Sequence, residues 1–140
     1  MDLQELSDRQ EIVDLITRYT RAVDTRSWDD LDEVFTEDAV VDYSPVGGPT
    51  DVPAAVKPWI AKGLAGFDRY QHVIGQVSIE LAGDEARATA YFTNPMVAVD
   101  PEGREKLWEV GGYYRHELRR TAEGWRSARM LDDVVWTRGF

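Results

Sequence analysis

Two histidines occur in this chain of 140 residues, and one of them is placed where it could transfer protons. His72 lies in the segment RYQHVIGQ, residues 69–76. Because an imidazole accepts and releases protons near neutral pH, His72 is the natural candidate for a general acid or base. A surface or hydrogen-bonded structural histidine would fit the same segment, so the segment alone leaves both interpretations open. His116 lies among charged residues in YYRHELRRT and is expected at the surface.

A catalytic histidine usually needs a carboxylate that orients the ring and stabilises its charged form. Among 26 acidic residues, Asp24 stands out because it follows the apolar stripe of a helix predicted over residues 6–23. A carboxylate at that end meets the negative pole of the helix dipole, which is unfavourable unless a partner compensates. Asp24 could therefore serve His72, or it could begin the next turn or cap the next helix.

Two tyrosines could bring hydroxyl groups to the same place. Tyr19 precedes Asp24 by five residues, or about 500° of helical rotation, so the two side chains do not share one face. Both could still reach a cavity at the helix end. Tyr43 lies in a short strand predicted over residues 39–44. A tyrosine hydroxyl in an apolar pocket can polarise a carbonyl or protonate a leaving oxygen, although each residue could instead belong to the core.

The rest of the sequence contains no competing catalytic motif. The chain has no cysteine, which excludes disulfides and thiolate chemistry. It also lacks the GxSxG, P-loop, GxGxxG and HExxH motifs. Two histidines without cysteine argue against a histidine-rich metal site, so neither a metal nor a cofactor is expected.

Composition and charge limit the partners of the chain. The formal net charge is −10, and a strongly acidic chain repels the phosphate backbone, so no nucleic acid partner is expected. The sequence shows neither a signal peptide nor an apolar run of the roughly 18 residues that a membrane span needs. We therefore expect a cytoplasmic protein without membrane contact, folded as one domain over residues 1–140.

Helices predicted in the first half must position Asp24 and the strand that carries Tyr43. Apolar residues recur with a period near 3.6 over residues 6–23. The segment SWDDLDEVFTED predicts a second helix over residues 27–38, with Ser27 as its N-cap. The segment DVPAAVKPWIAKGLAG predicts a third helix over residues 51–66, which Pro58 should kink or interrupt.

From residue 68 onward the apolar period changes to two, which predicts strands. Helices followed by a meander of long strands indicate an α+β fold, with the sheet curved into a cone around a pocket at its mouth. Strict alternation places His72 on the more polar face of its strand, together with Ile74, Gln76, Ser78 and Glu80. The strand candidates cover residues 69–81, 85–99, 106–121 and 124–138.

Over nearly its whole length the chain resembles the SnoaL-like branch of the nuclear transport factor 2-like (NTF2-like) superfamily. Scytalone dehydratase and bile acid 7α-dehydratase belong to this group. The resemblance implies the cone-shaped α+β fold that the periodicity also indicates. It is carried by the segments IVDLITRYTRAVDTRSWDDLDEVFTEDAVVDYS, QHVIGQVSIEL, GYYRHELRRTAEGWRSARM and VVWTRG.

The resemblance also implies a site. In the dehydratases of this group, an aspartate at the end of the first long helix pairs with the histidine of a QH-x-IG-like strand, and these positions match Asp24 and His72. Tyr43 and Tyr19 match tyrosines of the group, and Arg138 is the nearest match to an arginine near the C-terminus. Scytalone dehydratase carries a second histidine near the third helix, and this chain has none there. Scytalone itself is therefore not the expected substrate.

The resemblance and these residues together predict a cofactor-free dehydratase or isomerase-type lyase for a hydrophobic, oxygenated small molecule that is steroid-like or polyketide-like. His72 would act as general base and then as acid, Asp24 would orient it, and Tyr43 and Tyr19 would bind the developing oxyanion. The alternatives are a polyketide cyclase that performs an aldol condensation, and a non-catalytic module for ligand binding or subunit interaction. Further substrate-binding candidates are Arg138, Asn94, Tyr114, Trp59, Phe92, Trp108 and Trp136.

The broad face of such a sheet is expected to pair with another copy of the chain. The result would be a homo-oligomer, either a dimer or a trimer. The residues expected on this face are Val110, Tyr114, Leu118, Leu131 and Trp136.

Overall fold

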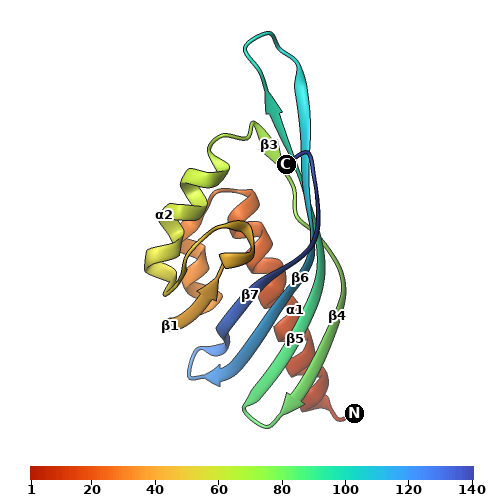
Figure 1. Cartoon of the computed structure of the whole chain (residues 1–140). Helices are drawn as coiled ribbons and strands as arrows, with labels where there is room; N and C mark the ends of the chain where they lie inside the picture. The colour runs from red at the N-terminus through yellow and green to blue at the C-terminus, as the bar shows by residue number, and fades with distance from the viewer.

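Two helices pack against the concave side of a curved sheet in the computed structural model, which describes residues 1–140 (Figure 1). The helix α1 (Leu3–Asp24) runs along the sheet, and α2 (Pro53–Leu64) lies near the end at which α1 terminates. Neither helix is long and apolar enough to cross a membrane. The predicted α+β architecture, with helices on one side of a curved and mainly antiparallel sheet, is confirmed.

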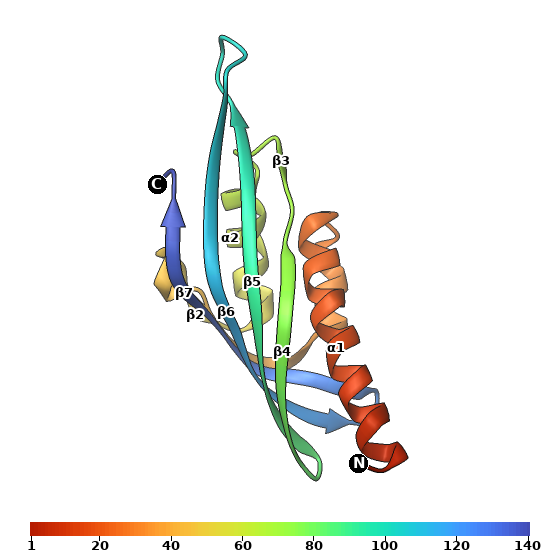
Figure 2. The same ribbon diagram turned by 90° about the vertical axis from the view of Figure 1, so that its right-hand side faces the viewer.

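The sheet contains seven strands in the order β2-β1-β7-β6-β5-β3, and β4 also pairs with β5. Every pair is antiparallel except β1 with β7. Figure 2 shows how the long strands β5, β6 and β7 form the curved wall that faces the helices. The strands are β1 (Phe35–Asp42), β2 (Thr50–Asp51), β3 (Arg69–Tyr70), β4 (Val73–Ala82), β5 (Glu85–Val99), β6 (Glu105–Thr121) and β7 (Gly124–Arg138).

The helix α1 forms where the apolar period of 3.6 predicts it, and it begins three residues before the predicted start at residue 6. The side chain of Asp2 caps its N-terminus by accepting a hydrogen bond of 2.8 Å from the backbone N–H of Glu5. Its apolar stripe is buried against the sheet, and Ile12, Leu15 and Ile16 are at most 1% exposed. The rigid helix therefore sets the position of its last residue, Asp24.

The structure corrects the predictions for two helical segments. The predicted second helix is only a short 3-10 helix, η1 (Trp28–Glu33), and the strand β1 already begins at Phe35. The backbone of Val34 accepts a hydrogen bond of 2.8 Å from Ser127 on β7, so pairing with the sheet takes over before a regular helix can extend. The helix α2 runs without interruption through Pro58, which it accommodates in its interior.

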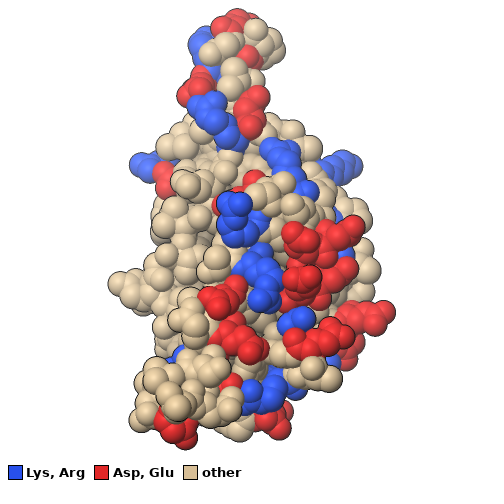
Figure 3. Space-filling model, turned by 180° about the vertical axis from the view of Figure 1, so that it is seen from behind, with Lys and Arg blue, Asp and Glu red and all other residues tan.

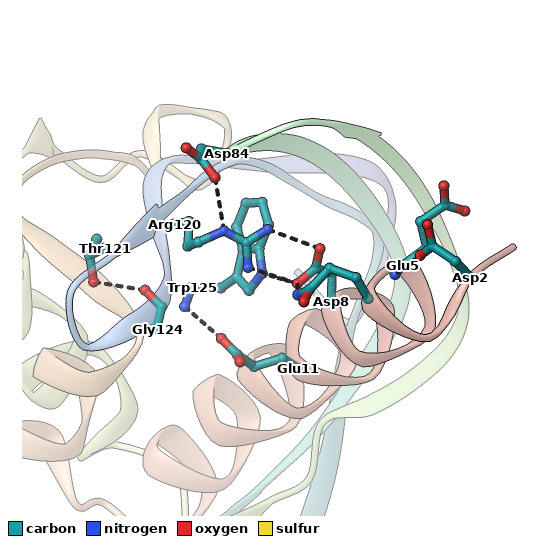
Figure 4. Close-up of polar contacts among 10 residues, drawn as sticks. Asp2, Glu5, Asp8, Glu11, Asp84, Arg120, Thr121, Gly124 and Trp125 are labelled. Carbon is teal, nitrogen blue, oxygen red and sulfur yellow. Dashed lines mark hydrogen bonds and ion pairs between the residues drawn. The ribbon is translucent and has the colours of Figure 1, made fainter.

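A polar network surrounds Arg120 and Trp125 beside the N-terminal part of α1 (Figure 4). The Nη1 and Nη2 atoms of Arg120 donate hydrogen bonds to the two carboxylate oxygens of Asp8 on α1, at 2.8 and 3.0 Å. The indole of Trp125 donates to the same carboxylate at 3.1 Å, and Glu11 accepts from the backbone of Trp125 at 2.6 Å. The hydrogen bonds from Arg120 hold the pKa of Asp8 far below its usual value. This network ties α1 to the hairpin between β6 and β7.

His116 is buried, so the prediction of a surface position is wrong. Only 2% of its surface is exposed, and its Nδ1 lies 2.9 Å from the hydroxyl of Ser127. Its charged neighbours in the sequence, Arg115 and Glu117, point to the opposite face because side chains alternate along a strand. Burial lowers the pKa of His116 to about 4, so the ring is uncharged in the folded protein at neutral pH.

The outer face of the sheet differs from the one predicted. Val110, Tyr114 and Leu118 are buried on the inner face, where the parity of β6 turns them toward α1. Of the other two predicted residues, Trp136 lies on the outer side as expected and Leu131 is half-buried. The other exposed apolar side chains on the outer side are Val73, Tyr91 and Val135. Seen from behind, acidic and basic side chains are mixed over the surface, and the hairpin of β5 and β6 extends beyond the body as an arm (Figure 3).

Candidate active site

A cavity of about 240 Å³ lies between α2, the C-terminal part of α1 and the concave face of the sheet. Thirteen of its 17 lining residues are hydrophobic, so the cavity suits an apolar ligand. The lining is Tyr19, Val23, Tyr43, Val46, Trp59, Ile60, Gly63, Leu64, Phe67, His72, Phe92, Asn94, Met96, Val110, Tyr114, Asp132 and Phe140.

Asp24 and His72 form a hydrogen-bonded pair at the wall of this cavity. The Nδ1 atom of His72 lies 2.6 Å from Oδ1 of Asp24. The backbone N–H of His72 also donates to the same carboxylate, at 3.0 and 3.2 Å. The His72 side chain is 4% exposed and that of Asp24 is 17% exposed. A carboxylate on Nδ1 favours the tautomer with its proton there, which leaves Nε2 as a proton acceptor for a ligand.

A bulge in β4 explains why His72 turns inward despite its polar neighbours. Ile74 pairs with Phe92 and Val77 pairs with Ala90, so Gly75 and Gln76 together face the single residue Tyr91. The extra residue reverses the side-chain alternation, and the part of the chain before the bulge therefore points its even-numbered side chains inward. His72 therefore shares the inward face with Ile74, as predicted, whereas the prediction that Gln76, Ser78 and Glu80 lie on the same face is wrong.

The segment that carries His72 is also tied to the end of α1. The hydroxyl of Tyr70 on β3 donates a hydrogen bond of 2.8 Å to the backbone carbonyl of Val23. The backbone N–H of Gln71 donates to the carbonyl of Pro95 on β5, at 3.1 Å. These bonds hold the segment between the helix end and the sheet, where the Asp24 carboxylate accepts hydrogen bonds from the backbone N–H and from Nδ1 of His72. The unfavourable position of a carboxylate at the C-terminal end of a helix is thereby compensated.

Three tyrosines form the polar part of the cavity. The hydroxyl oxygens of Tyr19 and Tyr43 are 2.5 Å apart, and both residues are buried. The ring centroid of Tyr114 lies 5.1 Å from that of Tyr19 and 6.3 Å from that of His72. Burial raises the pKa of all three hydroxyls well above the usual value, so they are neutral hydrogen-bond donors at physiological pH.

The close approach of α2 to Tyr43 depends on a glycine. The rings of Tyr43 and Trp59 lie 5.2 Å apart. A Cβ atom at Gly48 would lie 2.6 Å from the Trp59 ring and 2.8 Å from Cβ of Tyr43. Only glycine therefore lets the loop after β1 pass beside this aromatic pair, which forms one wall of the cavity.

Four of the seven predicted substrate-binding residues line the cavity, namely Asn94, Tyr114, Trp59 and Phe92. The other three do not. Trp108 packs with Phe140 at a centroid distance of 4.7 Å without lining the cavity itself. Trp136 lies on the outer face over Gly111, where a Cβ atom would come within 2.1 Å of its ring. The Arg138 side chain is 68% exposed and forms an ion pair with Glu109.

Asp132 is a cavity residue that the sequence reasoning missed. It is 6% exposed, and burial, followed by the nearby carboxylates of Asp133 and Asp42, raises its pKa to about 7. A signal was present in the sequence, because alternation along β7 places Asp132 on the same face as the buried Met130 and the half-buried Val134. No group of three or more His, Cys, Asp or Glu side chains is arranged to hold a metal ion.

Comparison with known proteins gives a match along almost the whole chain. The family described as the SnoaL-like domain matches residues 4–130. Among curated proteins, the uncharacterized protein Rv2910c of Mycobacterium tuberculosis is 36% identical over 132 residues, which cover 94% of this chain and 88% of that protein.

Solved structures share the same fold. A protein of Novosphingobium aromaticivorans, provisionally named an aromatic ring hydroxylase, is 32% identical with a TM-score of 0.83, covering 96% of this chain and 94% of that one. A second protein from this organism, strain DSM 12444, carries the provisional name scytalone dehydratase. It is 18% identical with a TM-score of 0.84, and the match covers 97% of this chain and 89% of that one.

Proposed function

Because the chain belongs to the SnoaL-like domain family and has an NTF2-like fold, we propose that it is a cofactor-free lyase or isomerase for an uncharged, apolar molecule that carries a carbonyl group. The observation that carries this proposal is the 2.6 Å contact between Asp24 and His72 at the wall of an apolar cavity. The similarity in fold to a protein provisionally named scytalone dehydratase makes elimination of water the first reaction to test.

The first step is removal of a proton from the carbon next to the carbonyl. Nε2 of His72 takes this proton, and the carboxylate of Asp24 stabilises the imidazolium that forms. The electron pair of the broken C–H bond moves toward the carbonyl oxygen, which becomes negative. The neutral hydroxyl of Tyr43 donates a hydrogen bond that stabilises this oxyanion, and the hydroxyl of Tyr19, 2.5 Å away, supports it by donating to Tyr43.

The second step decides between the two reaction classes. In a dehydratase, the imidazolium of His72 returns its proton to a hydroxyl group on the β carbon. Water leaves, a carbon–carbon double bond forms, and His72 is again neutral. In an isomerase, the same proton returns to another carbon of the conjugated system. Both reactions use the same residues, so the position of a leaving hydroxyl on the substrate decides the outcome.

The size of the cavity limits the substrate. A volume of about 240 Å³ lies below the roughly 300–1,000 Å³ of pockets that hold drug-sized ligands. The stacked rings of Phe92 and Tyr114, 4.0 Å apart, provide a flat apolar surface on one wall. We therefore favour a planar substrate of one or two rings over a four-ring steroid.

The proposal is tested with 3-hydroxy-1-tetralone, a two-ring β-hydroxy ketone that gives fluorescent 1-naphthol after loss of water. Deuterium exchange at the carbon next to the carbonyl is followed by NMR in the same samples. We expect the wild-type protein to accelerate exchange and dehydration. His72→Ala should lower both rates at least about a hundredfold, the usual scale for loss of a general base.

Two controls separate chemistry from folding. Thermal melting of His72→Ala should remain cooperative, and Asp29→Asn, a change of an exposed carboxylate, should leave the rates unchanged. Equal rates for His72→Ala and wild type would contradict the proposal. Binding of the ketone by wild type without any exchange would also contradict it and would indicate a non-catalytic ligand-binding module.

A further inference from the structure

Two carboxyl groups are buried in this protein, and their oxygen atoms are satisfied very differently. Asp8 and Asp132 are 5% and 6% exposed. The carboxylate of Asp8 accepts hydrogen bonds from Gln4, Arg120 and Trp125. In contrast, Oδ1 of Asp132 is buried and has no hydrogen-bond partner. Because buried polar atoms are nearly always paired, the unpaired oxygen of Asp132 indicates a missing partner, as does the unpaired Oδ1 of Asn94 in the same cavity.

The strand register places Asp132 between two tyrosines of the cavity. On one side, β6 places Tyr114 directly opposite Asp132. On the other side, β1 runs parallel to β7 with Asp42 opposite Leu131, so Tyr43 reaches the level of Asp132. Asp132, Tyr43 and Tyr114 all line the cavity. The unpaired oxygen therefore belongs to a residue of the cavity wall, next to the hydroxyl groups that the proposed reaction uses.

Nearby carboxylates oppose a negative charge on Asp132. Burial is the main cause that raises its pKa to about 7, and the carboxylates of Asp133 and Asp42 add to it. Asp133 is itself paired with Arg115 on the outer face, at 2.7 Å, so that guanidinium is engaged with Asp133. At pH 6 the carboxyl of Asp132 is therefore mostly protonated and has an O–H group to donate.

The tyrosines on the other elements around the cavity stay protonated themselves and do not take up this proton. Tyr19 on α1, Tyr43 after β1 and Tyr114 on β6 have pKa values raised well above the usual one, and they stay neutral donors. His72 lies in the same cavity, but its Nδ1 is engaged by Asp24. Around Asp132 the cavity therefore presents three neutral hydroxyl groups, and its acceptors are Nε2 of His72 and the unpaired Oδ1 of Asn94.

We propose that Asp132 is a ligand-binding residue of the cavity, whose neutral carboxyl group donates a hydrogen bond to an oxygen acceptor of an uncharged ligand beside the hydroxyl of Tyr43. The identification of this acceptor with the carbonyl of the substrate rests on the proposed function. The O–H bond of Asp132 stays intact, and no proton is transferred. Two donors on one oxygen stabilise the oxyanion more than the ground-state carbonyl, which is how a preorganised site lowers a barrier.

The inference assigns a chemical class to the ligand. It should be an aryl ketone, or another planar molecule whose single acceptor oxygen reaches the Tyr43–Asp132 end while its rings lie on Phe92 and Tyr114. When Asp132 ionises, its donor is lost and its charge repels the acceptor. Binding of such a ligand should therefore weaken as the pH rises through 7, whereas binding of the same rings without the oxygen should not.

The test uses 2-acetylnaphthalene as the ketone and 2-ethylnaphthalene as the matched hydrocarbon without an acceptor. Neither compound titrates, and binding to the full-length protein is measured by fluorescence between pH 5.5 and 8.5. For wild type we expect the ketone affinity to fall at least about tenfold over this range, since affinity drops tenfold per pH unit above the pKa of a required acid. The affinity for 2-ethylnaphthalene should stay constant.

Two variants isolate Asp132 from the other groups in the cavity. Asp132→Asn keeps an N–H donor that cannot ionise, so its affinity for the ketone should change less than about twofold between pH 5.5 and 8.5. Asp132→Leu removes the donor, and its affinity at pH 6 should be about tenfold lower than that of wild type, in line with the loss of one hydrogen bond. In wild type at pH 6, the carbonyl stretch of bound 2-acetylnaphthalene should lie at lower frequency than in Asp132→Leu.

Several outcomes would overturn the inference. They are equal pH profiles for wild type and Asp132→Asn, equal ketone affinity for wild type and Asp132→Leu at pH 6, and no measurable ketone binding by wild type. Because the measurement is of binding, it does not require turnover. An inert enzyme that still shows the pH-dependent ketone binding would remove the proposed reaction and leave the Asp132 subsite in place.

Discussion

Replacing Asp132 by asparagine should make the protein more stable at alkaline pH relative to wild type, and the size of the effect follows from its burial. The folded protein holds the pKa of this carboxyl at about 7, against about 3.9 for an unperturbed aspartate. Between pH 4 and 7 the unfolded chain has therefore already lost the proton that the folded protein keeps. Stability falls with rising pH over this window and levels off above 7.

The expected magnitude is a few kcal/mol. Each tenfold change in an ionisation constant is worth about 1.4 kcal/mol, so a pKa raised from about 3.9 to about 7 corresponds to about 4 kcal/mol by pH 8. Because only 6% of Asp132 is exposed, solvent screening reduces this figure little. The asparagine of Asp132→Asn cannot ionise and has nearly the same shape as aspartate. The free energy of unfolding of this variant relative to wild type should therefore rise by about 4 kcal/mol between pH 4 and pH 8.

The wild-type profile alone would hide this effect, because His116 has the opposite slope. Burial lowers the pKa of His116 to about 4, against about 6.5 for a free imidazole, so stability rises with pH between 4 and 6.5 by about 3 kcal/mol. The two contributions largely cancel over that range. The difference between Asp132→Asn and wild type removes the contribution of His116 and isolates Asp132.

Urea unfolding followed by tryptophan fluorescence measures this difference, since Trp125 is 1% exposed in the folded protein. The free energy of unfolding is determined from pH 4 to 8.5 at constant ionic strength. Asp29→Asn is the control, because it makes the same chemical change at a carboxylate whose side chain is 99% exposed and that does not affect the pKa of Asp132, so it should alter stability by no more than about 0.5 kcal/mol at any pH. A difference between Asp132→Asn and wild type that does not change with pH would refute the reasoning.

Two further predictions concern the elements that position the cavity. Deleting Gln76 removes the bulge in β4, so either His72 or the side chains of Val77 and Ile79 must turn outward. We expect the free energy of unfolding in urea to fall by at least about 2 kcal/mol and the activity that depends on Asp24 and His72 to be lost. Wild-type stability and activity in this variant would show that the bulge is dispensable. Asp8→Asn removes the charge that Arg120 contacts and should cost about 2–4 kcal/mol at pH 7. Because the pKa of Asp8 is lowered in the folded protein, its stabilising effect is lost at low pH, and the cost of Asp8→Asn should shrink as the pH falls below about 4. An equal cost at pH 3 and pH 7 would contradict the view that the charge of Asp8 stabilises the fold through Arg120.

The parts of this protein that could be predicted are those whose evidence is local. The stripe at Ile12, Leu15 and Ile16 predicts α1 because a helix repeats every 3.6 residues. Alternation along residues 85–99 and 106–121 predicts β5 and β6, because successive side chains of a strand point to opposite faces of the sheet. The second predicted helix failed because its aspartates and β-branched residues give weak helical propensity, and pairing of β1 with β7 overrode it.

The pairing of Asp24 with His72 was only partly accessible from the sequence. The residues themselves suggested a base and a carboxylate at an awkward helix end, and the resemblance to the SnoaL-like group joined them. Their contact spans 48 positions and depends on the bulge at Gly75 and Gln76 and on the bond from Tyr70 to Val23. A bulge exists only relative to a partner strand, so no pattern within one strand reveals it.

The sequence by itself determined the helix, the long strands, the acidic surface and the set of residue types available for chemistry. Only the tertiary structure decided which of these residues are buried and what they meet. His116 and Asp132 are both charged or titratable residues with polar neighbours in the chain, yet each is buried, because α1 and α2 cover the concave face. Burial and partners determine whether a side chain is charged, and those depend on which elements pack together rather than on the order of residues.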